Sequence, residues 1–387
     1  MSVVVATLKT CAMPVSSWVL ILVRYGRRLF TAAALLSAIL LSACAATNEL
    51  QVADRAGSTS SIAPITSLEI LSTESLPTTY AYNHASTIIE AANGDLLTAW
   101  GAGSEELADD CVIVLSRKRP GETTWSEPIV VADKPGYADA NPVLLAGEGD
   151  ELRLFYVEMF GDSFCLGRVM ERVSRDHGLT WGPPRDALKT VCTMIRNHIL
   201  ITRSGRWVMP AYQQAIYQSQ FLLSEDRGAT WSATGGLLTP SANNLQPAVV
   251  ELSDGSLYAL MRTGGGNNET WEGRSTDGGR TWKLGQRPEL PNPNSGLDLI
   301  RLSGGQLVLA YNPSKTERTP LSVSISNDEG RTWSAPQTIE DGEAQLSYPS
   351  LWQSSDGAIH LTYSQRLQRI RHVELRTGDA RGAANRK

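Results

Sequence analysis

An eight-residue motif, Ser-x-Asp-x-Gly-x-Thr-Trp, recurs along the chain and constrains its fold more than any other feature. Full copies occupy 174–181, 224–231, 275–282 and 326–333, so that successive tryptophans lie 50, 51 and 51 residues apart, and a looser copy at 116–125 keeps Ser, Gly, Thr and Trp without the Asp. Self-similarity at this period is typical of an array of repeated supersecondary units. The motif itself suits a turn, because Asp can cap backbone N–H groups, Gly can take a positive φ and Trp can fill the space between sheets. We therefore assign no catalytic role to its acids, which are Asp176, Asp226, Asp277 and Asp328.

Glycine turns between short apolar runs are a second, independent marker of the repeat. They occur six times, at Gly94, Gly149, Gly205, Gly255, Gly305 and Gly357. The flanking runs are rich in Val, Leu and Tyr, which predicts strands joined by tight hairpins. Four strands per fifty residues are typical of a propeller blade. The alternative, a parallel solenoid, would show a shorter repeat.

We therefore predict an all-β fold, a six-bladed β-propeller of four-stranded antiparallel blades over residues 62–378. The sixth repeat has only three strands before the repeats end, so we expect a strand within 65–71 to complete it and close the ring. Residues 44–61, rich in Ala, Ser and Thr, are predicted to be a flexible tether, and residues 379–387 a polar tail.

Residues 1–43 have the pattern of a signal peptide and are left out of the fold. Three arginines precede an apolar stretch at 29–41, and the Leu-Ser-Ala that follows leads to Cys44, as in bacterial lipoprotein signals with a lipidated cysteine. The stretch is short for a membrane span. A signal anchor that uses the apolar run at 18–23 is the alternative. We expect an exported lipoprotein anchored through Cys44, in the outer membrane because no aspartate follows the cysteine.

Composition narrows the possible partners. The net charge of −5 and the absence of a Lys/Arg-rich run argue against binding to nucleic acid. The predicted domain contains Cys111, Cys165 and Cys192, an odd number without metal-ligand spacing. The sequence thus supports neither a disulfide framework nor a zinc site, and we interpret the three cysteines as small buried residues. No metal or nucleotide motif is present, so we expect no cofactor.

Strand directions predict which residues meet at one face of the propeller. The innermost strand of each blade begins with polar residues, namely Asn83 and His84, Asn141, Asn197 and His198, Gln246, Asn294 and Ser295, and Tyr348. Because these strands converge on the axis, the residues are expected to form a ring of hydrogen-bonding groups around a central pocket.

The loops expected at the same face carry charges of both signs. They are Glu105, Glu106, Asp109, Asp110, Glu158, Asp162, Glu269, Arg262 and Arg318, and Arg196 flanks the third innermost strand. Arginines opposed by carboxylates suit an anionic sugar, because a guanidinium binds a carboxylate through two hydrogen bonds while an acid protonates a leaving oxygen. The alternative is that each group is a solvated loop charge.

With these motifs in place, the chain resembles the sialidase (neuraminidase) superfamily, whose six-bladed propellers carry aspartate boxes. It looks closest to the bacterial predicted-neuraminidase, or BNR repeat-like, branch. The segments that carry the resemblance are NGDLLTAW at 93–100, QPAVVELSDG at 246–255, NPNSGLDLIRL at 292–302, YNPS at 311–314, RTPLSVSISNDEGRTW at 318–333 and IRHVEL at 370–375.

The resemblance implies roles for particular residues. Sialidases hold a substrate carboxylate with three arginines and use a tyrosine nucleophile assisted by a glutamate, with an aspartate from a first-blade loop as acid/base. By this resemblance Arg262 and Arg318 are the second and third arginines, and Tyr348 is the nucleophile. A neutral phenol does not repel an anionic sugar as a carboxylate would.

Two positions depart from the family pattern. Tyr82-Asn83-His84-Ala85 stands where the first arginine is expected, and Gln246 stands where the glutamate partner of the tyrosine is expected. Arg196, His84 or His198 are candidates to compensate. Glu105, Glu106 and Asp110 are the candidates for the first-blade acid.

These residues predict an exo-acting glycosidase that releases a terminal acidic sugar, sialic acid or a relative, from glycans. The runner-up is a uronate-directed hydrolase or lyase in which His84 and His198 transfer protons. From a different class, the chain could be a non-catalytic glycan-binding surface lipoprotein.

Overall fold

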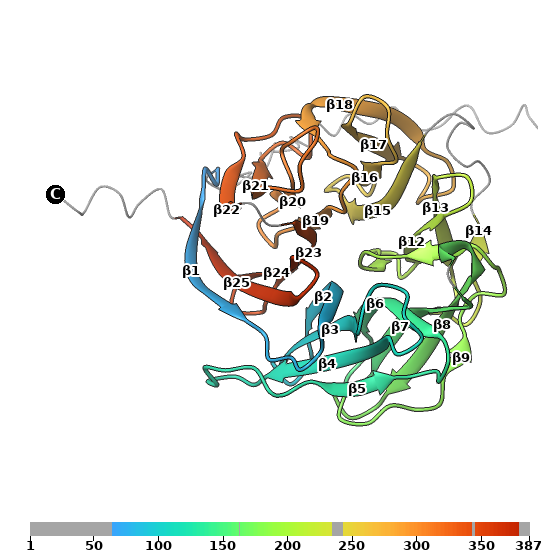
Figure 1. Ribbon diagram of the computed structural model, residues 1–387. Coiled ribbons are helices and arrows are strands. Elements are labelled where there is room, and N and C mark those ends of the chain that lie inside the picture. The colour runs from blue at the N-terminus through green and yellow to red at the C-terminus, as the bar shows by residue number, and fades with distance from the viewer. Residues whose placement is uncertain (1–63, 162, 234–242, 343–344, 379–387) are drawn as a thin grey trace, which may run out of the picture. The chain divides into compact units, whose positions relative to one another are not determined.

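The computed structural model describes residues 64–161, 163–233, 243–342 and 345–378. Within them the chain forms β-strands in six antiparallel sheets, together with one 3-10 turn, η1 (Phe164–Leu166). The sheets surround a central axis as the blades of a propeller (Figure 1). The predicted all-β six-bladed propeller is therefore confirmed.

The strands follow the chain from one blade to the next. Blade 1 contains β2 (Tyr82–Glu90), β3 (Leu96–Gly103), β4 (Val112–Lys118) and β5 (Ile129–Ala132), and blade 2 contains β6 (Ala138–Ala146), β7 (Leu152–Met159), β8 (Gly167–Ser174) and β9 (Arg185–Asp186). Blade 3 contains β10 (Thr193–Ile195), β11 (Leu200–Ile201), β12 (Trp207–Gln213), β13 (Gln218–Ser224) and β14 (Ser232–Ala233). Blade 4 contains β15 (Asn244–Glu251), β16 (Leu257–Thr263), β17 (Glu269–Ser275) and β18 (Lys283–Pro291), and blade 5 contains β19 (Asp298–Arg301), β20 (Leu307–Tyr311), β21 (Leu321–Ser326) and β22 (Gln337–Glu340). Blade 6 contains β23 (Leu346–Gln353), β24 (Ile359–Gln365), β25 (Arg369–Thr377) and, from the other end of the domain, β1 (Leu68–Ser75).

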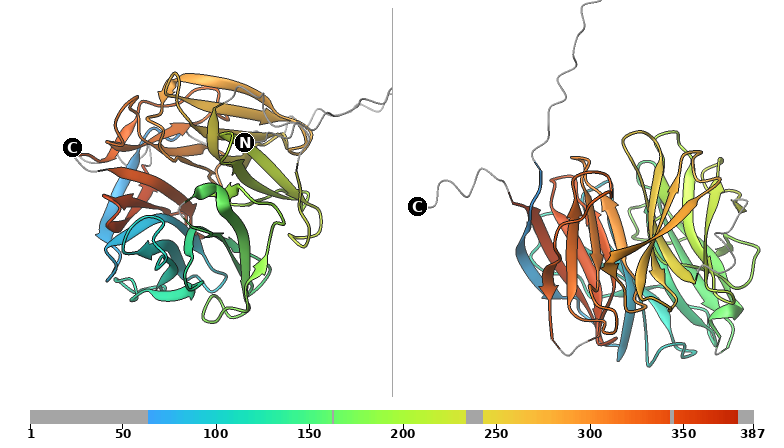
Figure 2. Two further views of the ribbon diagram at one scale, coloured as in Figure 1. Left: turned by 45° about the vertical axis from the view of Figure 1, so that its right-hand side comes forward. Right: turned by 90° about the horizontal axis from the view of Figure 1, so that it is seen from above.

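The ring closes between the two ends of the domain, as the incomplete sixth repeat predicts. Strand β1 pairs antiparallel with β25 from Leu68 opposite Thr377 to Ser75 opposite Arg371. Figures 1 and 2 show the blue β1 running along the red β25 in every view. The strand lies at 68–75, somewhat later than the predicted 65–71, because the apolar run supplies only its first residues.

Blade 3 differs from the simple repeat because its innermost strand is interrupted. Strands β10 and β11 pair separately with β12, and residues 196–199 between them leave the ladder. Arg196 and His198 lie in this interruption, and their side chains contact Pro349 and Ser350, the residues of the innermost strand of blade 6.

The core lies between neighbouring blades, because each sheet is covered on both faces. The middle strands accordingly have almost no exposed positions, as in β3, β4 and β7. Between blades 2 and 3, for example, Phe155 and Val157 pack with Met209 and Leu222 in one buried cluster. Burial of this kind stabilises each blade by roughly 25 cal/mol per Å² of apolar surface removed from water.

The Ser-x-Asp-x-Gly-x-Thr-Trp segments form turns with one shared hydrogen-bond pattern. In the first full copy, the Asp176 carboxylate accepts hydrogen bonds from the Ser174 hydroxyl at 2.7 Å and from the Thr180 amide at 2.9 Å. The Gly178 amide donates to the Ser174 hydroxyl at 2.8 Å, and Gly178 has a φ of +80°. The same bonds recur around Asp226, Asp277 and Asp328. These acids are therefore used within their turns, as the repeat predicts.

The innermost strands share a β-bulge near the point where each one begins. The pairing register shifts in β2, β6, β15 and β23, and each shift contains one residue with positive φ: Ala85, Asn141, Gln246 and Tyr348. A bulge re-aims a side chain and occurs often at barrel rims and next to active sites. Because the bulge recurs at the start of four innermost strands, the four bulge residues all line the same pocket.

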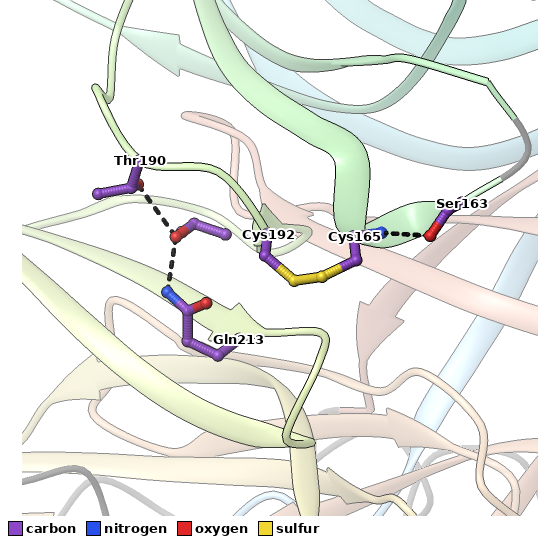
Figure 3. The surroundings of a disulfide bond; sticks show 6 residues. Ser163, Cys165, Thr190, Cys192 and Gln213 are labelled. Carbon is purple, nitrogen blue, oxygen red and sulfur yellow. Dashed lines mark hydrogen bonds between the residues drawn. A yellow bond between two sulfur atoms is a disulfide. The ribbon is translucent and has the colours of Figure 1, made fainter. Parts of the chain in front are cut away.

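The prediction that all three cysteines of the domain are unpaired buried residues is wrong. Cys165 and Cys192 form a disulfide across a separation of 27 residues, and only Cys111 is a free buried thiol in the described part of the chain. Figure 3 shows the bond joining η1 of blade 2 to the segment that leads into blade 3. The prediction failed because the two loops meet only once the blades have stacked, which spacing along the sequence does not reveal.

The predicted signal peptide, Cys44 and the tether up to residue 61 lie outside the described residues, as does the tail from 379 onward. Among residues that are described, no helix has the length and apolar character needed to cross a membrane. The predicted domain boundaries stay predictions.

Candidate functional site

A pocket opens on the axis at the face where the innermost strands begin. Eight residues singled out from the sequence line it: His84, Glu106, Asn141, Gln246, Arg262, Asn294, Arg318 and Tyr348. They come from blades 1, 2, 4, 5 and 6. Most lie on an innermost strand, just before one, or in a loop between a second and a third strand, whereas Arg262, predicted in such a loop, lies at the end of strand β16. The strand directions inferred from the repeat therefore place these side chains together.

The hydroxyl of Tyr348 is fixed in this pocket by two hydrogen bonds. The residue lies at the bulge of β23, and its hydroxyl accepts hydrogen bonds from Arg262 Nη1 at 2.8 Å and from Gln246 Nε2 at 3.0 Å. Burial acts to raise the pKa of Tyr348, but the Arg262 charge, the bond from Gln246 and the Arg318 charge outweigh it and leave the pKa below its ordinary value. The phenol oxygen is thus prepared to carry negative charge.

Arg262 and Arg318 are fixed by their neighbours at the pocket wall. Arg262 Nε donates to Asn294 Oδ1 at 2.7 Å, and Arg318 Nη2 donates to the Asn294 carbonyl at 2.9 Å. Asn294 has a φ of +57° just before β19, so the same bulge-like geometry supplies both contacts. Two guanidinium groups oriented from one residue suit an anionic ligand.

The structure separates the two residues proposed at the start of β2. His84 lines the pocket, with its ring centroid 4.2 Å from that of Tyr348 and its Nδ1 sharing a 2.9 Å hydrogen bond with the Ser364 hydroxyl. Asn83 points away, where its amide donates to the Tyr80 and Gln368 carbonyls. Asn83 therefore holds neighbouring backbone segments together and does not line the pocket. The bulge at Ala85 determines which side chain faces the pocket.

His84 is neutral in this environment. Burial, followed by the charges of Arg196, Arg318 and Arg262, holds the pKa of His84 well below its usual value. The side chain therefore offers the pocket a hydrogen-bonding imidazole and adds no third positive charge to the two arginines.

Arg196 and His198 lie beneath the pocket and do not line it. Arg196 is 2% exposed, with its Cζ 5.2 Å from the ring centroid of Tyr348 and its Nη2 donating to the Pro349 carbonyl at 2.8 Å. His198 lines a second pocket, together with Trp352 and Gln353, and contacts the Ser350 hydroxyl at 3.1 Å. Only Arg196 therefore acts on the pocket, and it does so from below the tyrosine ring.

The first-blade acids take different positions. Glu106 lines the pocket, and burial raises its pKa against the opposing charges of Arg318 and Arg262. Asp110 instead accepts hydrogen bonds from the Ser104 amide and hydroxyl at 3.1 and 3.0 Å, and Glu105 is exposed outside the pocket lining. Of the three candidates, Glu106 alone reaches the pocket.

Among the residues of the pocket wall that sequence reasoning missed, two carry polar groups that bear on the site. Tyr212 from β12 lies 3.4 Å from Gln246 Nε2, whose amide donates to its hydroxyl. Asp139 from β6 is 1% exposed and pairs in register with Glu158 on β7, and burial followed by the Glu158 charge raises the pKa of Asp139 to about 8. The sequence places Asp139 two residues before Asn141, but nothing along the chain shows that another carboxyl lies opposite it.

No cluster of three or more His, Cys, Asp or Glu side chains in the described ranges is placed to hold a metal ion. The polar groups of the pocket are mainly guanidinium, amide and phenol groups, which bind anions and sugars better than cations.

Comparisons with known proteins identify the family of the chain. The profile of the BNR repeat-like domain matches residues 94–361. The anhydrosialidase of Macrobdella decora is 22% identical over 243 residues, 55% of this chain and 32% of that protein, and the sialidase of Micromonospora viridifaciens is 28% identical over 157 residues, 38% of this chain and 24% of that protein. The chain thus matches about a third or less of the length of these relatives.

Among solved structures, the Hadza microbial sialidase superposes with a TM-score of 0.66 at 18% identity, over 77% of this chain and 66% of that one. At this identity the likeness shows the fold. Because the family profile spans more than half of the sequence, this chain belongs to the BNR repeat-like family of the sialidase superfamily.

Proposed function

We propose that this protein is an exo-acting glycoside hydrolase of the sialidase type that releases a terminal acidic sugar, sialic acid or a relative, from a glycan. The observation that carries the proposal is the Tyr348 hydroxyl, held at 2.8 Å by Arg262 and at 3.0 Å by Gln246 in a pocket that also contains Arg318. The names of the relatives, which are sialidases, support the reaction class.

Each group has a role that its chemistry allows. Arg262 and Arg318 would bind the carboxylate of the sugar, and Tyr348 would attack the anomeric carbon from within the pocket. Glu106, whose pKa burial raises, would protonate the oxygen of the leaving aglycone. His84 and Asn141 would supply hydrogen bonds to the sugar ring.

The neutral imidazole of His84 favours one second candidate. A uronate-directed glycosidase or lyase needs a proton-transfer group beside the sugar, and His84 contacts the Tyr348 ring at that position. His198, which lines a different pocket, would take no part in this reaction.

The test is turnover of aryl glycosides of sialic, glucuronic and galacturonic acids, with Tyr348→Phe as the control. We expect release from the sialoside and loss of that release in the control. Release from a uronide alone would move the assignment to the second candidate. Binding of glycans without any turnover would instead indicate a non-catalytic glycan-binding protein.

We also propose that the protein is exported and lipid-anchored through Cys44, with the outer membrane as its site. The Cys165–Cys192 disulfide supports export, because such bonds persist in oxidising compartments. Labelling with a radioactive fatty acid that Cys44→Ala abolishes is the expected result. Equal labelling of both proteins would contradict the proposal.

A further inference from the structure

Hydrogen-bond direction at Tyr348 can be deduced from the chemistry of its neighbours. A guanidinium group can only donate, so the Gln246 atom 3.0 Å from Arg262 Nη1 must be the carbonyl oxygen Oε1. The amide nitrogen of Gln246 therefore faces Tyr348, and its N–H donates to the hydroxyl oxygen. Since Arg262 also donates there, Tyr348 Oη receives two N–H groups.

The described residues of the site provide no acceptor for the proton of the Tyr348 hydroxyl. Across the described residues, no protein oxygen accepts a hydrogen bond from Tyr348 Oη, and the position where a proton acceptor is expected from the family pattern holds Gln246. An amide cannot take a proton from a phenol at physiological pH. The surroundings of Oη are those that stabilise an oxyanion.

Arg196 provides the second, independent observation. Its guanidinium is buried beneath the Tyr348 ring, where Nε has no hydrogen-bond partner and no described carboxylate forms an ion pair with it. An unpaired buried cation is strongly unfavourable unless an anion lies nearby. The buried carboxyl of Asp298, which also lies 3.7 Å from His198 Nε2, supplies part of that negative charge, and a negative Tyr348 would supply the rest.

We propose that Tyr348 is held as a phenolate in the resting protein, with Gln246 and Arg262 as its hydrogen-bond donors and Arg196 as its buried counter-charge. The inference deepens the proposed function, since it says how the nucleophile is formed without a general base. Arg196 and Gln246 are then positioning residues that act through Tyr348.

The other charged or titratable groups that face Tyr348 are compatible with a phenolate. Arg318 is positive, burial holds the pKa of His84 well below its usual value, and desolvation raises the pKa of Glu106 against the charges of Arg318 and Arg262. Burial raises the pKa values of Tyr82 and Tyr212, the latter also through the charge on Tyr348, so both remain neutral phenols. The buried carboxyl that acts on Arg196 is Asp298, which also faces His198, and burial raises the pKa of Asp298.

The reaction then balances without a base for the nucleophile. The Tyr348 oxyanion forms a bond to the anomeric carbon, the glycosidic C–O bond breaks, and the aglycone oxygen takes its proton from Glu106. Water next attacks the anomeric carbon and gives a proton to the Glu106 carboxylate, while the bonding electron pair returns to Tyr348 Oη. Both groups end in their starting states.

The test is a spectroscopic titration that needs no substrate. The tyrosinate absorbance of the full chain is compared with that of Tyr348→Phe from about pH 5 to pH 10, near where an ordinary tyrosine ionises. We expect one tyrosinate per chain at neutral pH that the variant lacks. Coincident titrations of the two proteins up to the ordinary tyrosine range would overturn the proposal.

Two further variants test the positioning residues. Gln246→Glu, which keeps the size of the side chain, places a negative charge beside Oη and should move the tyrosinate titration upward by about one pH unit or more. Arg196→Met should do the same and should shift the acidic limb of the kcat profile, while KM changes little because Arg196 does not line the pocket. An unchanged titration in a folded Gln246→Glu protein would refute the role of Gln246.

This experiment separates the phenolate from the proposed function. Tyrosinate without turnover of any glycoside would keep the phenolate and remove the glycosidase. Turnover without tyrosinate would keep the glycosidase and remove the phenolate.

Discussion

Replacing Asp139 with Asn should stabilise the protein, and the effect should depend on pH. Asp139 and Glu158 lie opposite each other in the β6–β7 ladder and are 1% and 3% exposed. Arg168 Nη2 donates to Glu158 Oε1 at 2.8 Å, whereas Asp139 Oδ1 has no partner in the described chain. Folding therefore buries two carboxyl groups with one cation between them.

The sign of the effect follows from the raised pKa of Asp139, which is about 8 in the folded chain. Unfolded aspartate ionises near pH 3.9, so between about pH 4 and pH 8 the folded protein binds more protons than the unfolded one. Stability must then fall as pH rises through this window. At about pH 7 the difference is roughly three pKa units, or about 4 kcal/mol as an upper bound, because buried sites relax.

We expect Asp139→Asn to gain about 2–4 kcal/mol in free energy of unfolding near pH 7 and almost nothing near pH 4, since asparagine has no proton to lose. Urea unfolding of the wild type and the variant at both pH values measures this directly. The Asn oxygen still accepts the Lys134 amide, and its N–H₂ faces Glu158 favourably.

Asp95→Asn is the matched control. Asp95 is also buried, but it forms an ion pair with Arg117, so its loss should lower stability by about 3 kcal/mol. An Asp139→Asn protein that is less stable than wild type near pH 7, or equally stabilised at both pH values, would refute the reasoning.

Three other outcomes follow from the structure. Cys192→Ser should lower the free energy of unfolding by about 3–4 kcal/mol in urea, because the disulfide closes a loop of 27 residues, and reductant should abolish the difference from wild type. Gly330→Ala should lower the melting temperature far more than Gly205→Ala, since both have positive φ but only at Gly330 would a Cβ lie 2.5 Å from the Tyr258 ring. Glu106→Gln should slow release of poor leaving groups by about 10²-fold or more and that of acidic phenols much less, as measured by kcat.

The repeat predicted the fold well because its signals are local. Each Ser-x-Asp-x-Gly-x-Thr-Trp turn makes its hydrogen bonds within eight residues, so the residue types and their spacing are sufficient to define it. The strand directions then follow from hairpin geometry, and with them the face on which Arg262, Arg318 and Tyr348 meet. Fold and pocket location are therefore readable from sequence alone.

The predictions that failed concern contacts that depend on a shift of one residue in strand register, or on partners far apart in the sequence. Asn83 and His84 are neighbours, yet the β2 bulge sends only His84 into the pocket. Asp139 has its unusual environment because Glu158 lies across the ladder, and Cys165 meets Cys192 between two blades. None of these relations leaves a pattern along the chain.

The departures from the sialidase pattern compensate one another electrically. Replacing the first arginine by a neutral His84 removes one positive charge, and replacing the glutamate by Gln246 removes one negative charge, so the sum around Tyr348 is unchanged. The buried Arg196 then adds a positive charge from beneath the ring, and Asp298 together with an anion at Tyr348 would balance it. If Tyr348 is the phenolate proposed above, the site needs no general base to form the nucleophile, because Arg262, Gln246 and Arg196 stabilise its negative charge in the resting protein.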